Sequence, residues 1–200
     1  MRVSGLFKKK RFVIATVLLF MVLLLCLCVV PCYGKRSTYY LACGELKSDE
    51  FIRFVMLMPS GVSEVVIIIN STGGTLYDLL GILSTVEKLK SKGIKVVTLV
   101  QGIAASAAFV LWQVGDYRMM TPSSAAMYHG LRTVPGASLS ASQRRYIESV
   151  QRKLNELAAH RMCGPARNEV ESVRLGSDDI WFDSETAQTS CLVDEIVQSP

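Results

Sequence analysis

Hydrophobic residues recur along this chain with two different periods, and the two periods alternate. The clearest β-rich runs, Glu64 to Asn70 and Lys95 to Val100, have the unbroken apolar character of strands buried on both faces of a sheet. Between them, apolar residues recur at helical spacing over 76–89, and Lys92 and Gly93 then supply the basic and glycine residues typical of a helix C-terminus. Strands that alternate with helices in this way predict an α/β fold.

Weaker patterns extend this alternation on both sides. Residues 39–42 predict a first strand, and residues 47–58 predict a first helix. A long helix is expected over 146–162, preceded by a capping box at Ser140 and Gln143. This helix is suited to cover its own sheet or to pack on a partner subunit, because its apolar stripe is narrow. The stripe consists of Ile147, Val150, Leu154 and Leu157.

The first 36 residues have a different character from the predicted domain over 37–200. Basic residues precede an apolar run of 19 residues, Phe12 to Val30, which is long enough to span a bilayer as a helix. A single-pass inner-membrane anchor over residues 12–30 is therefore expected, with the domain outside the cytoplasm by the positive-inside rule. The alternative is a cleaved signal peptide, because Cys32 and Gly34 place small residues before Lys35. Cleavage would make the domain periplasmic or secreted.

Charge excludes one class of partner. The net charge of +5 arises in residues 1–36, which hold seven of the 22 basic residues and no acidic ones. The remaining 15 basic residues stand against 17 acidic ones, a formal charge of −2 without a long basic run. Nucleic acid is therefore not an expected partner. With 200 residues and half of them hydrophobic, the chain is expected to build one core.

Three cysteines fall within the predicted domain. Cys43, Cys163 and Cys191 do not have the spacing of metal ligands, and no metal or other cofactor is expected. We interpret them as small buried hydrophobic residues. Pairing of two of them in an oxidising compartment stays open, because separation along the chain gives no geometry.

Two glycine-bearing turns follow the two clearest strands. The first is Ser71-Thr72-Gly73-Gly74, and the second, Gly102 to Phe109, holds Ser106 among alanines. Taken alone, these alanines are explained by close packing of a helix on a sheet. If the two strands are parallel neighbours, however, both turns lie at one sheet edge, where α/β proteins bind ligands. Gly74 and Ala107 can then offer backbone N–H groups to an oxyanion beside a serine nucleophile.

One of the chain's two histidines is a candidate base for this serine. His129 follows Ala125 to Tyr128, which has the pattern of a strand end, so it would meet Ser106 if the two strands are adjacent. His160 lies within the predicted long helix, and we interpret it as structural. A carboxylate that orients the base is sought at Asp178 and Asp179.

The order and spacing of these segments resemble the proteolytic subunit of the Clp protease over about residues 37–197. The matching segments are Ile69 to Gly74, Gly102 to Phe109, Met127 to His129, Leu154 to His160 and Ala187 to Val197. The resemblance implies the ClpP/crotonase-like fold, a superhelical repeat of strand-strand-helix units with a protruding handle helix. It also implies a serine endopeptidase that cleaves peptide or protein substrates through an acyl-enzyme intermediate.

The resemblance assigns roles to particular residues. Ser106 matches the family's nucleophile, His129 its base and Asp179, rather than Asp178, its orienting carboxylate. Gly74 and Ala107 match its oxyanion-hole donors. Substrate is implied to lie extended near Thr72 to Leu76 and Leu131 to Val134, so the expected substrate-binding residues are Thr72, Gly73 and Leu131.

Several positions depart from the family pattern. Thr72 stands in place of a proline, Gly130 and Leu131 in place of glutamine and proline, and Ile180 in place of the arginine that joins two rings. A homo-oligomer, with a ring as one form, is expected, whereas a double ring is in doubt. The N-terminal parts that engage the family's ATPase are replaced by the apolar run, so a Clp ATPase partner is doubtful and ATP-independent activity is expected.

Three alternatives remain open. The first is a membrane protease of the signal peptide peptidase A or NfeD type, which shares the fold but uses a lysine base; Lys153 is the sole lysine after Ser106. The second is a catalytically inactive scaffold subunit of the same family. The third and weakest is an acyl-CoA enzyme of the crotonase group, for which this chain is short.

Overall fold

The computed structural model describes residues 37–133, 136 and 138–198. The anchor or signal peptide expected within residues 1–36 lies outside these described residues. Among the residues that are described, no helix combines the length and the apolar character needed to cross a membrane.

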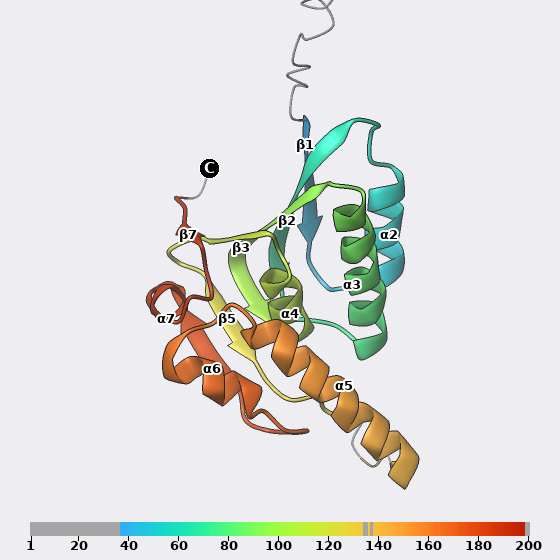
Figure 1. Ribbon diagram of the computed structural model, residues 1–200, viewed down its shortest axis with the longest axis vertical. Helices are drawn as coiled ribbons and strands as arrows, with labels where there is room; N and C mark the ends of the chain where they lie inside the picture. The colour runs from blue at the N-terminus through green and yellow to red at the C-terminus, as the bar shows by residue number, and fades with distance from the viewer. Residues whose placement is uncertain (1–36, 134–135, 137, 199–200) are drawn as a thin grey trace, which may run out of the picture. The chain divides into compact units, whose positions relative to one another are not determined.

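The described domain is built on a mixed sheet, as the alternation of strands and helices predicts (Figure 1). Five parallel strands lie in the spatial order β1 (Ser37–Cys43), β2 (Val62–Ser71), β3 (Lys95–Ala105), β4 (Tyr117–Met120) and β7 (Glu195–Ile196). Strand β5 (Ala125–Tyr128) also pairs with β3 in parallel, and β6 (Ile180–Asp183) pairs with β5 in the antiparallel sense. The α/β class is thereby confirmed.

Helices connect most of the strands. They are α2 (Ser48–Met56), α3 (Leu76–Ser91), α4 (Ala107–Gln113), α5 (Ala141–Ala159), α6 (Gly164–Glu171) and α7 (Ser184–Thr189). Figure 1 shows α2 and α3 side by side along the sheet and α5 projecting past it. The predicted helices over 47–58, 76–89 and 146–162 correspond to α2, α3 and α5, and the capping box of Ser140 and Gln143 is present at the start of α5.

Strand β3 pairs with two different strands along its length on the side away from β2. Its first half pairs with β4 at Val97–Val100, and its second half pairs with β5 at Ile103–Ala105. The change of partner coincides with a bulge beside β2, where Gly102 has a φ of 118° and a Cβ would lie 2.4 Å from Asn70 Oδ1. Glycine is required there, because a side chain would collide with Asn70 and the φ is unfavourable for other residues. The bulge carries β3 on to Ala105, five residues beyond the predicted strand end.

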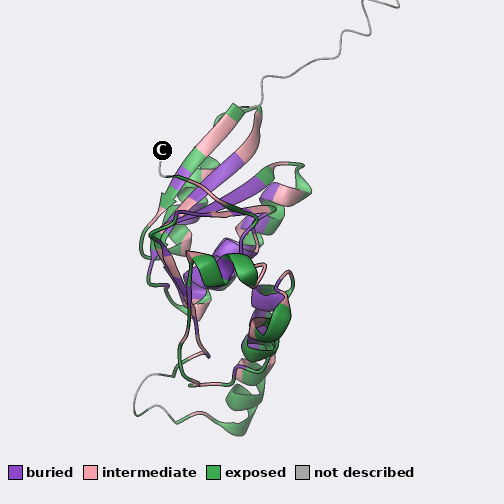
Figure 2. Cartoon of the chain, turned by 90° about the vertical axis from the view of Figure 1, so that its left-hand side faces the viewer, coloured by how far each residue is buried: buried purple, intermediate pink, exposed green. Residues whose placement is uncertain are grey.

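The buried face of α5 differs from the predicted stripe. Val150 and Leu154 are buried as expected, but Ile147 is only half-buried and Leu157 is 37% exposed. Their places are taken by small and polar residues, namely Gln151, Asn155, Ala158 and Ala159. Figure 2 shows the burial concentrated in the sheet and inner helices, whereas the first turns of α5 are exposed. The helix thus covers its own sheet with its C-terminal part only.

The interpretation of all three cysteines as buried hydrophobic residues is wrong for two of them. Cys163 and Cys191 form a disulfide across 28 residues, and it joins the N-terminus of α6 to the turn after α7. Cys191 has a φ of 56°, in the left-handed region, so a tight turn brings it back to α6. The separation of the two cysteines along the sequence did not predict that this turn brings them together. Cys43 is free and half-buried.

Candidate active site

Ser106 occupies a sharp turn between a strand and a helix. It directly follows β3, forms the N-terminal cap of α4 and has φ 57° and ψ −121°, a combination that non-glycine residues rarely adopt. Its amide donates to Met127 O at 2.8 Å, and its carbonyl accepts from Phe109 N at 3.1 Å. These bonds hold the residue in a strained conformation, and such strain concentrates at functional sites.

The first glycine turn packs directly against Ser106, as expected for neighbouring parallel strands. Strand β2 pairs in parallel with β3, and Gly73 follows it with a φ of 114°. A Cβ at Gly73 would lie 2.9 Å from Ala105 O and 3.0 Å from Ser106 Cβ. The buried Ser71 hydroxyl accepts from Gly73 N at 3.1 Å and so fixes the turn. The predicted meeting of the two turns is therefore confirmed.

Two backbone amides beside Ser106 are free to bind a ligand atom. Among the described residues, the N–H groups of Gly74 and Ala107 find no hydrogen-bond acceptor. Ala107 is the first residue of α4, whose N–H has no partner within the helix. Unpaired amides that flank a serine are the kind of donors that stabilise an oxyanion.

His129 shares a pocket with Ser106. Strand β5 lies beside the end of β3 with Ala105 opposite Met127, so the residues that follow both strand ends meet. A pocket of about 30 Å³ contains both side chains, together with residues from α3, α4 and α5. It is lined by Gly74, Leu76, Leu79, Ser106, Ala107, Val110, Tyr128, His129, Leu131, Gln151 and Leu154. Four of the residues predicted for catalysis and the oxyanion hole thus line one small cavity.

The imidazole of His129 is held by the backbone of its own turn. Its Nδ1 lies 2.6 Å from Gly130 O. Because a carbonyl oxygen only accepts hydrogen bonds, Nδ1 carries the proton and Nε2 has the free lone pair in the neutral ring. Among the hydrogen bonds of the described residues, none joins Ser106 to His129. The arrangement therefore fixes the tautomer of the candidate base, His129, and does not hydrogen-bond it to Ser106.

Asp179 is not among the residues that line this pocket. It directly precedes β6, and its carboxylate forms an ion pair with the Arg132 guanidinium. The side chain of Arg132 is 58% exposed and that of Asp179 33% exposed, so the pair lies at the surface. The structure brings Ser106 and His129 together, but it shows Asp179 bound to a residue that the sequence did not single out.

Leu131 and Thr72 differ in how they meet the pocket. Leu131 lines it, but both of its backbone polar groups are occupied: its N–H donates to Gln151 Oε1 at 2.6 Å, and its carbonyl accepts from Gly176 N at 3.1 Å. Thr72 is exposed and does not line the pocket. A substrate strand therefore has no free backbone partner at Leu131 in this arrangement.

Gly130, the residue after His129, is packed against the backbone of Arg174. A Cβ at Gly130 would lie 1.7 Å from Arg174 O, so only glycine fits beneath the 174–177 segment. The replacement of the family's glutamine at this position is thus a packing requirement.

Two other basic side chains do not line the pocket. Lys153, the candidate lysine base, is exposed on α5 and does not line the cavity that holds Ser106. His160 caps the C-terminus of α5, is exposed and bonds through Nδ1 to Leu157 O at 2.9 Å. Its position agrees with a structural role.

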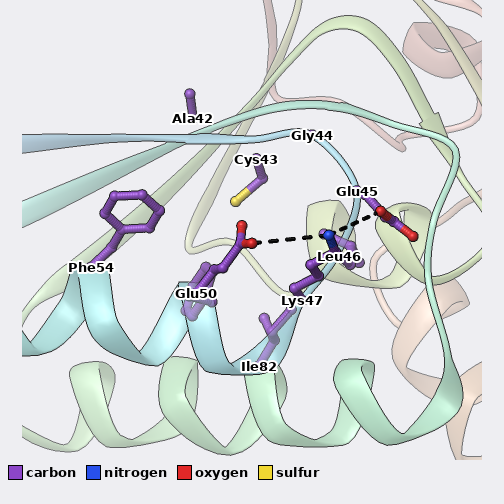
Figure 3. A pocket seen from close by; sticks show the side chains of 10 residues that line it. Ala42, Cys43, Gly44, Glu45, Leu46, Lys47, Glu50, Phe54 and Ile82 are labelled. Atoms are coloured by element: carbon purple, nitrogen blue, oxygen red, sulfur yellow. Dashed lines mark ion pairs between the residues drawn. The ribbon is translucent and has the colours of Figure 1, made fainter.

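Cys43 is a free cysteine, and a cysteine thiol is a second type of candidate nucleophile. It lies in a separate pocket beside Lys47, whose ammonium forms ion pairs with Glu45 at 3.4 Å and Glu50 at 4.0 Å (Figure 3). Burial raises the pKa of the Cys43 thiol to about 12, so the reactive thiolate is not populated at neutral pH. No histidine lines this pocket. Across the described residues, no group of His, Cys, Asp or Glu side chains is placed to hold a metal ion.

Comparison with known proteins agrees with the geometry. A model of the Clp protease family matches residues 46–200. The chain is 30% identical over 141 residues to the ATP-dependent Clp protease proteolytic subunit of Bacteroides thetaiotaomicron, covering 67% of this chain and 60% of that protein. It is also 30% identical over 141 residues to the ATP-dependent Clp protease proteolytic subunit 3 of Rhodococcus jostii, covering 68% and 66%. The chain thus spans about three fifths to two thirds of the length of these relatives.

Proposed function

The chain belongs to the Clp protease family, and on this premise we propose that it is a serine endopeptidase with Ser106 as nucleophile and His129 as general base. The single observation that carries the proposal is the strained Ser106, held at the strand-to-helix turn in one pocket with His129. The two unpaired amides beside it supply the other requirement of acyl transfer.

The proposed reaction follows from these positions. Ser106 Oγ attacks the scissile carbonyl carbon while His129 Nε2 takes the hydroxyl proton. The resulting oxyanion accepts hydrogen bonds from the N–H groups of Gly74 and Ala107. Collapse breaks the C–N bond, and His129 returns its proton to the departing amine. Water then attacks the acyl-enzyme with His129 again as base, which releases the acid and restores Ser106.

Asp179 is proposed as the third member of the triad once its ion pair with Arg132 opens. A carboxylate next to the imidazole stabilises the imidazolium that forms when His129 accepts the proton. In the described arrangement, Gly130 O already performs the other duty of a triad carboxylate, because it fixes the tautomer. The contribution left for Asp179 is electrostatic.

The substrate is proposed to be an extended peptide, as cleavage of an unfolded protein requires. Its main chain is expected to add to the Thr72–Gly73 side of the site, because the backbone groups of Leu131 are already paired. Leu131 would then contact the substrate through its side chain, which lines the pocket. The fold is accordingly interpreted as the superhelical ClpP/crotonase type, with α5 as its handle helix.

Assembly into a homo-oligomer is part of the proposal. Proteins of the ClpP family form oligomeric rings that act on protein substrates. In this chain, α2 and the residue after it expose large apolar side chains that an assembly would cover: Ile52, Phe54, Met56 and Leu57. Native mass measurement tests this proposal, and a monomer at micromolar concentration contradicts it.

Export or membrane tethering is also proposed. The apolar run over 12–30 and the basic residues before it support it, and so does the disulfide between Cys163 and Cys191, since disulfides persist in oxidising compartments. A domain outside the cytoplasm lacks ATP, so peptidase activity is expected without an ATPase. Cell fractionation followed by probe labelling tests this; label confined to the cytoplasmic fraction contradicts it.

The decisive test of the chemistry uses a fluorophosphonate probe, which forms a covalent bond with an activated serine. Wild type is expected to be labelled, whereas the Ser106→Ala and His129→Ala variants are not. Lys153→Ala and His160→Ala serve as matched controls and should label like wild type. Loss of labelling in Lys153→Ala but not in His129→Ala would establish the serine-lysine mechanism instead. Absence of labelling in assembled wild type would establish an inactive scaffold.

A further inference from the structure

Helix α5 buries two amide side chains that the proposed mechanism does not use. Gln151 and Asn155 are each 3% exposed, one turn apart on the face that covers the sheet. Buried amides are costly unless each donor and acceptor finds a partner. The partners of Gln151 therefore indicate what this polar face holds in place.

The Gln151 amide contacts both sides of the His129 turn. Its Oε1 accepts from Leu131 N at 2.6 Å, two residues after His129. Its Nε2 lies 3.3 Å from the hydroxyl of Tyr128, the residue before His129, and donates to Asn155 Oδ1 at 2.7 Å. One side chain thus holds the backbone on one side of the base and a neighbouring side chain on the other.

Tyr128 and Asn155 complete this network. The Tyr128 hydroxyl donates to Asn155 Oδ1 at 2.7 Å, and burial raises the pKa of Tyr128 well above its usual range, which keeps the hydroxyl protonated. Asn155 Nδ2 donates to Glu171 O at 3.1 Å and Val173 O at 2.9 Å. The network is therefore satisfied on every side and anchored to the segment that leads to β6. Networks of this kind stiffen the structure around them.

The segment between the two contacts consists of His129 and Gly130, and it is also held by the packing of Gly130 against Arg174 O. Gly130 has no side chain, and its carbonyl is the acceptor that fixes the His129 tautomer. A shift of the Leu131 backbone moves this carbonyl, because the two residues share a peptide bond. The direction of the imidazole thus depends on the Gln151 hydrogen bond.

We propose that Gln151 is a positioning residue that orients the His129 imidazole toward Ser106 by holding Leu131 N–H and the Tyr128 hydroxyl. The proposal rests on the proposed role of His129 as general base. Gln151 itself does not touch the reacting atoms; it acts through the turn that carries the base. Displacement of a catalytic group by about 1 Å costs about 100-fold in rate.

Gln151→Leu is the sharpest variant. Gln151 also lines a neighbouring cleft of about 350 Å³ between α5 and residues 173–175, so a much smaller side chain would join the two cavities. Leucine keeps most of the volume and removes the hydrogen bonds. Gln151→Glu keeps an oxygen that accepts from Leu131 N and serves as the conservative variant. Val150→Ala is the matched control, because Val150 is buried on the same helix but lines neither cavity.

The first measurement is the rate of fluorophosphonate labelling at Ser106, with folding of each variant checked by thermal unfolding. Gln151→Leu is expected to label at least tenfold more slowly than wild type, and Gln151→Glu within about threefold of it. Val150→Ala is expected to label within twofold of wild type despite its lost stability. Equal labelling rates in Gln151→Leu and Val150→Ala overturn the proposal.

The second measurement does not depend on activity. The chain has two histidines, so ¹H–¹⁵N spectra of the imidazoles contain two patterns, and exposed His160 is an internal reference. Wild type is expected to show His129 with its proton on Nδ1, and Gln151→Leu a mixture of tautomers, with His160 unchanged. An unaltered His129 pattern overturns the positioning role. Failure of wild type to react with the probe overturns the peptidase function instead, while these spectra still decide whether Gln151 orients His129.

Discussion

The Nδ1 of His129 lies 2.6 Å from the carbonyl oxygen of Gly130, the residue that follows it in the chain. This backbone contact fixes the proton on Nδ1 and leaves Nε2 to act as the base. In serine peptidases the tautomer is commonly fixed by a carboxylate. Here the proposed carboxylate, Asp179, is paired with Arg132 instead.

Asp179→Asn is therefore expected to reduce activity less than the corresponding substitution does in an enzyme whose triad carboxylate already contacts the histidine. A wrong tautomer costs about 10⁴-fold in kcat, but Gly130 O preserves the tautomer in this chain. We expect kcat/KM for a fluorogenic peptide to fall by about 10- to 100-fold, reflecting lost stabilisation of the imidazolium alone. His129→Ala should lose at least about 1,000-fold in the same assay. A loss of 10⁴-fold in Asp179→Asn would show that Asp179 sets the tautomer in the working enzyme.

Arg132→Gln is expected to raise activity, because it releases Asp179 toward the imidazole. The ion pair lies at the surface, where such pairs contribute about 0–1 kcal/mol, so the variant should remain folded. Fluorophosphonate labelling should accelerate by about three- to tenfold, the factor expected for about 1 kcal/mol of ion-pair free energy. Arg145→Gln, an exposed residue without an ion pair among the described residues, is the control. A slower Arg132→Gln variant would mean that Arg132 supports the site.

The sequence was sufficient to predict the parts of the site that follow from strand order. Buried β-branched runs before Gly73 and Ser106 predicted two strands, and the condition that these strands are parallel neighbours is met, so Ser106, His129, Gly74 and Ala107 lie at one sheet edge. This reasoning succeeds because the position of a residue at a strand end depends on backbone pairing alone.

The sequence was insufficient where side chains choose among several partners. Arg132 and Asp179 are 47 positions apart in the sequence, so nothing in the pattern selected this pair. Gln151 and Asn155 directly follow Val150 and Leu154 of the predicted stripe of α5, but an apolar pattern gives no reason to place polar residues on the buried face. A polar pair one turn apart, each member directly after an apolar residue of the stripe, was the available signal. The disulfide could not be predicted because it requires a tight turn at Cys191, and the residue with positive φ in this turn is a cysteine rather than a glycine.

Gly73→Ala is expected to disable the site by displacing the nucleophile. A Cβ at this position would lie 2.9 Å from Ala105 O and 3.0 Å from Ser106 Cβ, and the φ of 114° is strained for alanine. Probe labelling should fall at least about 100-fold, the cost of moving a reacting group by about 1 Å. Gly93→Ala is the control, because it carries a similar φ penalty with open space around its Cβ. If both variants label equally, close packing of Gly73 on Ser106 is not what holds the nucleophile.

Removal of the disulfide is expected to reduce stability without changing the site. Cys163 and Cys191 are 28 positions apart and enclose α6, β6 and α7, and closing a loop of this length contributes about 3–4 kcal/mol. The Cys163→Ser, Cys191→Ser double variant should therefore unfold at lower urea concentration. Reduction of wild type with dithiothreitol should lower its midpoint to a similar value, and Cys43→Ser should not. An unchanged midpoint in both cases would contradict the disulfide.

Stability is expected to fall at acidic pH through Asp194. Its carboxylate binds the Arg118 guanidinium at 3.0 Å and that of Arg161 at 2.7 Å, and Arg118 is only 2% exposed. Burial alone would raise the pKa of Asp194, but the hydrogen bonds and charge of Arg118, with the charge of Arg161, outweigh it and hold the pKa below its usual range. The stabilising contribution is therefore complete above the unfolded pKa of about 3.9 and is lost as the pH falls through the lower folded value.

Asp194→Asn isolates this contribution from the other carboxylates, because they are common to both proteins. At pH 7 the variant leaves the buried Arg118 guanidinium without its counter-ion, and we expect its free energy of unfolding to fall by about 3–5 kcal/mol. Below about pH 4 Asp194 of the unfolded chain becomes protonated, so the stabilising contribution shrinks and the difference between the two proteins should narrow until the folded carboxylate is protonated as well. Urea unfolding from pH 7 to pH 3 measures it directly. A difference that stays constant over this range would mean that packing of the side chain, rather than its charge, holds Arg118 in the core.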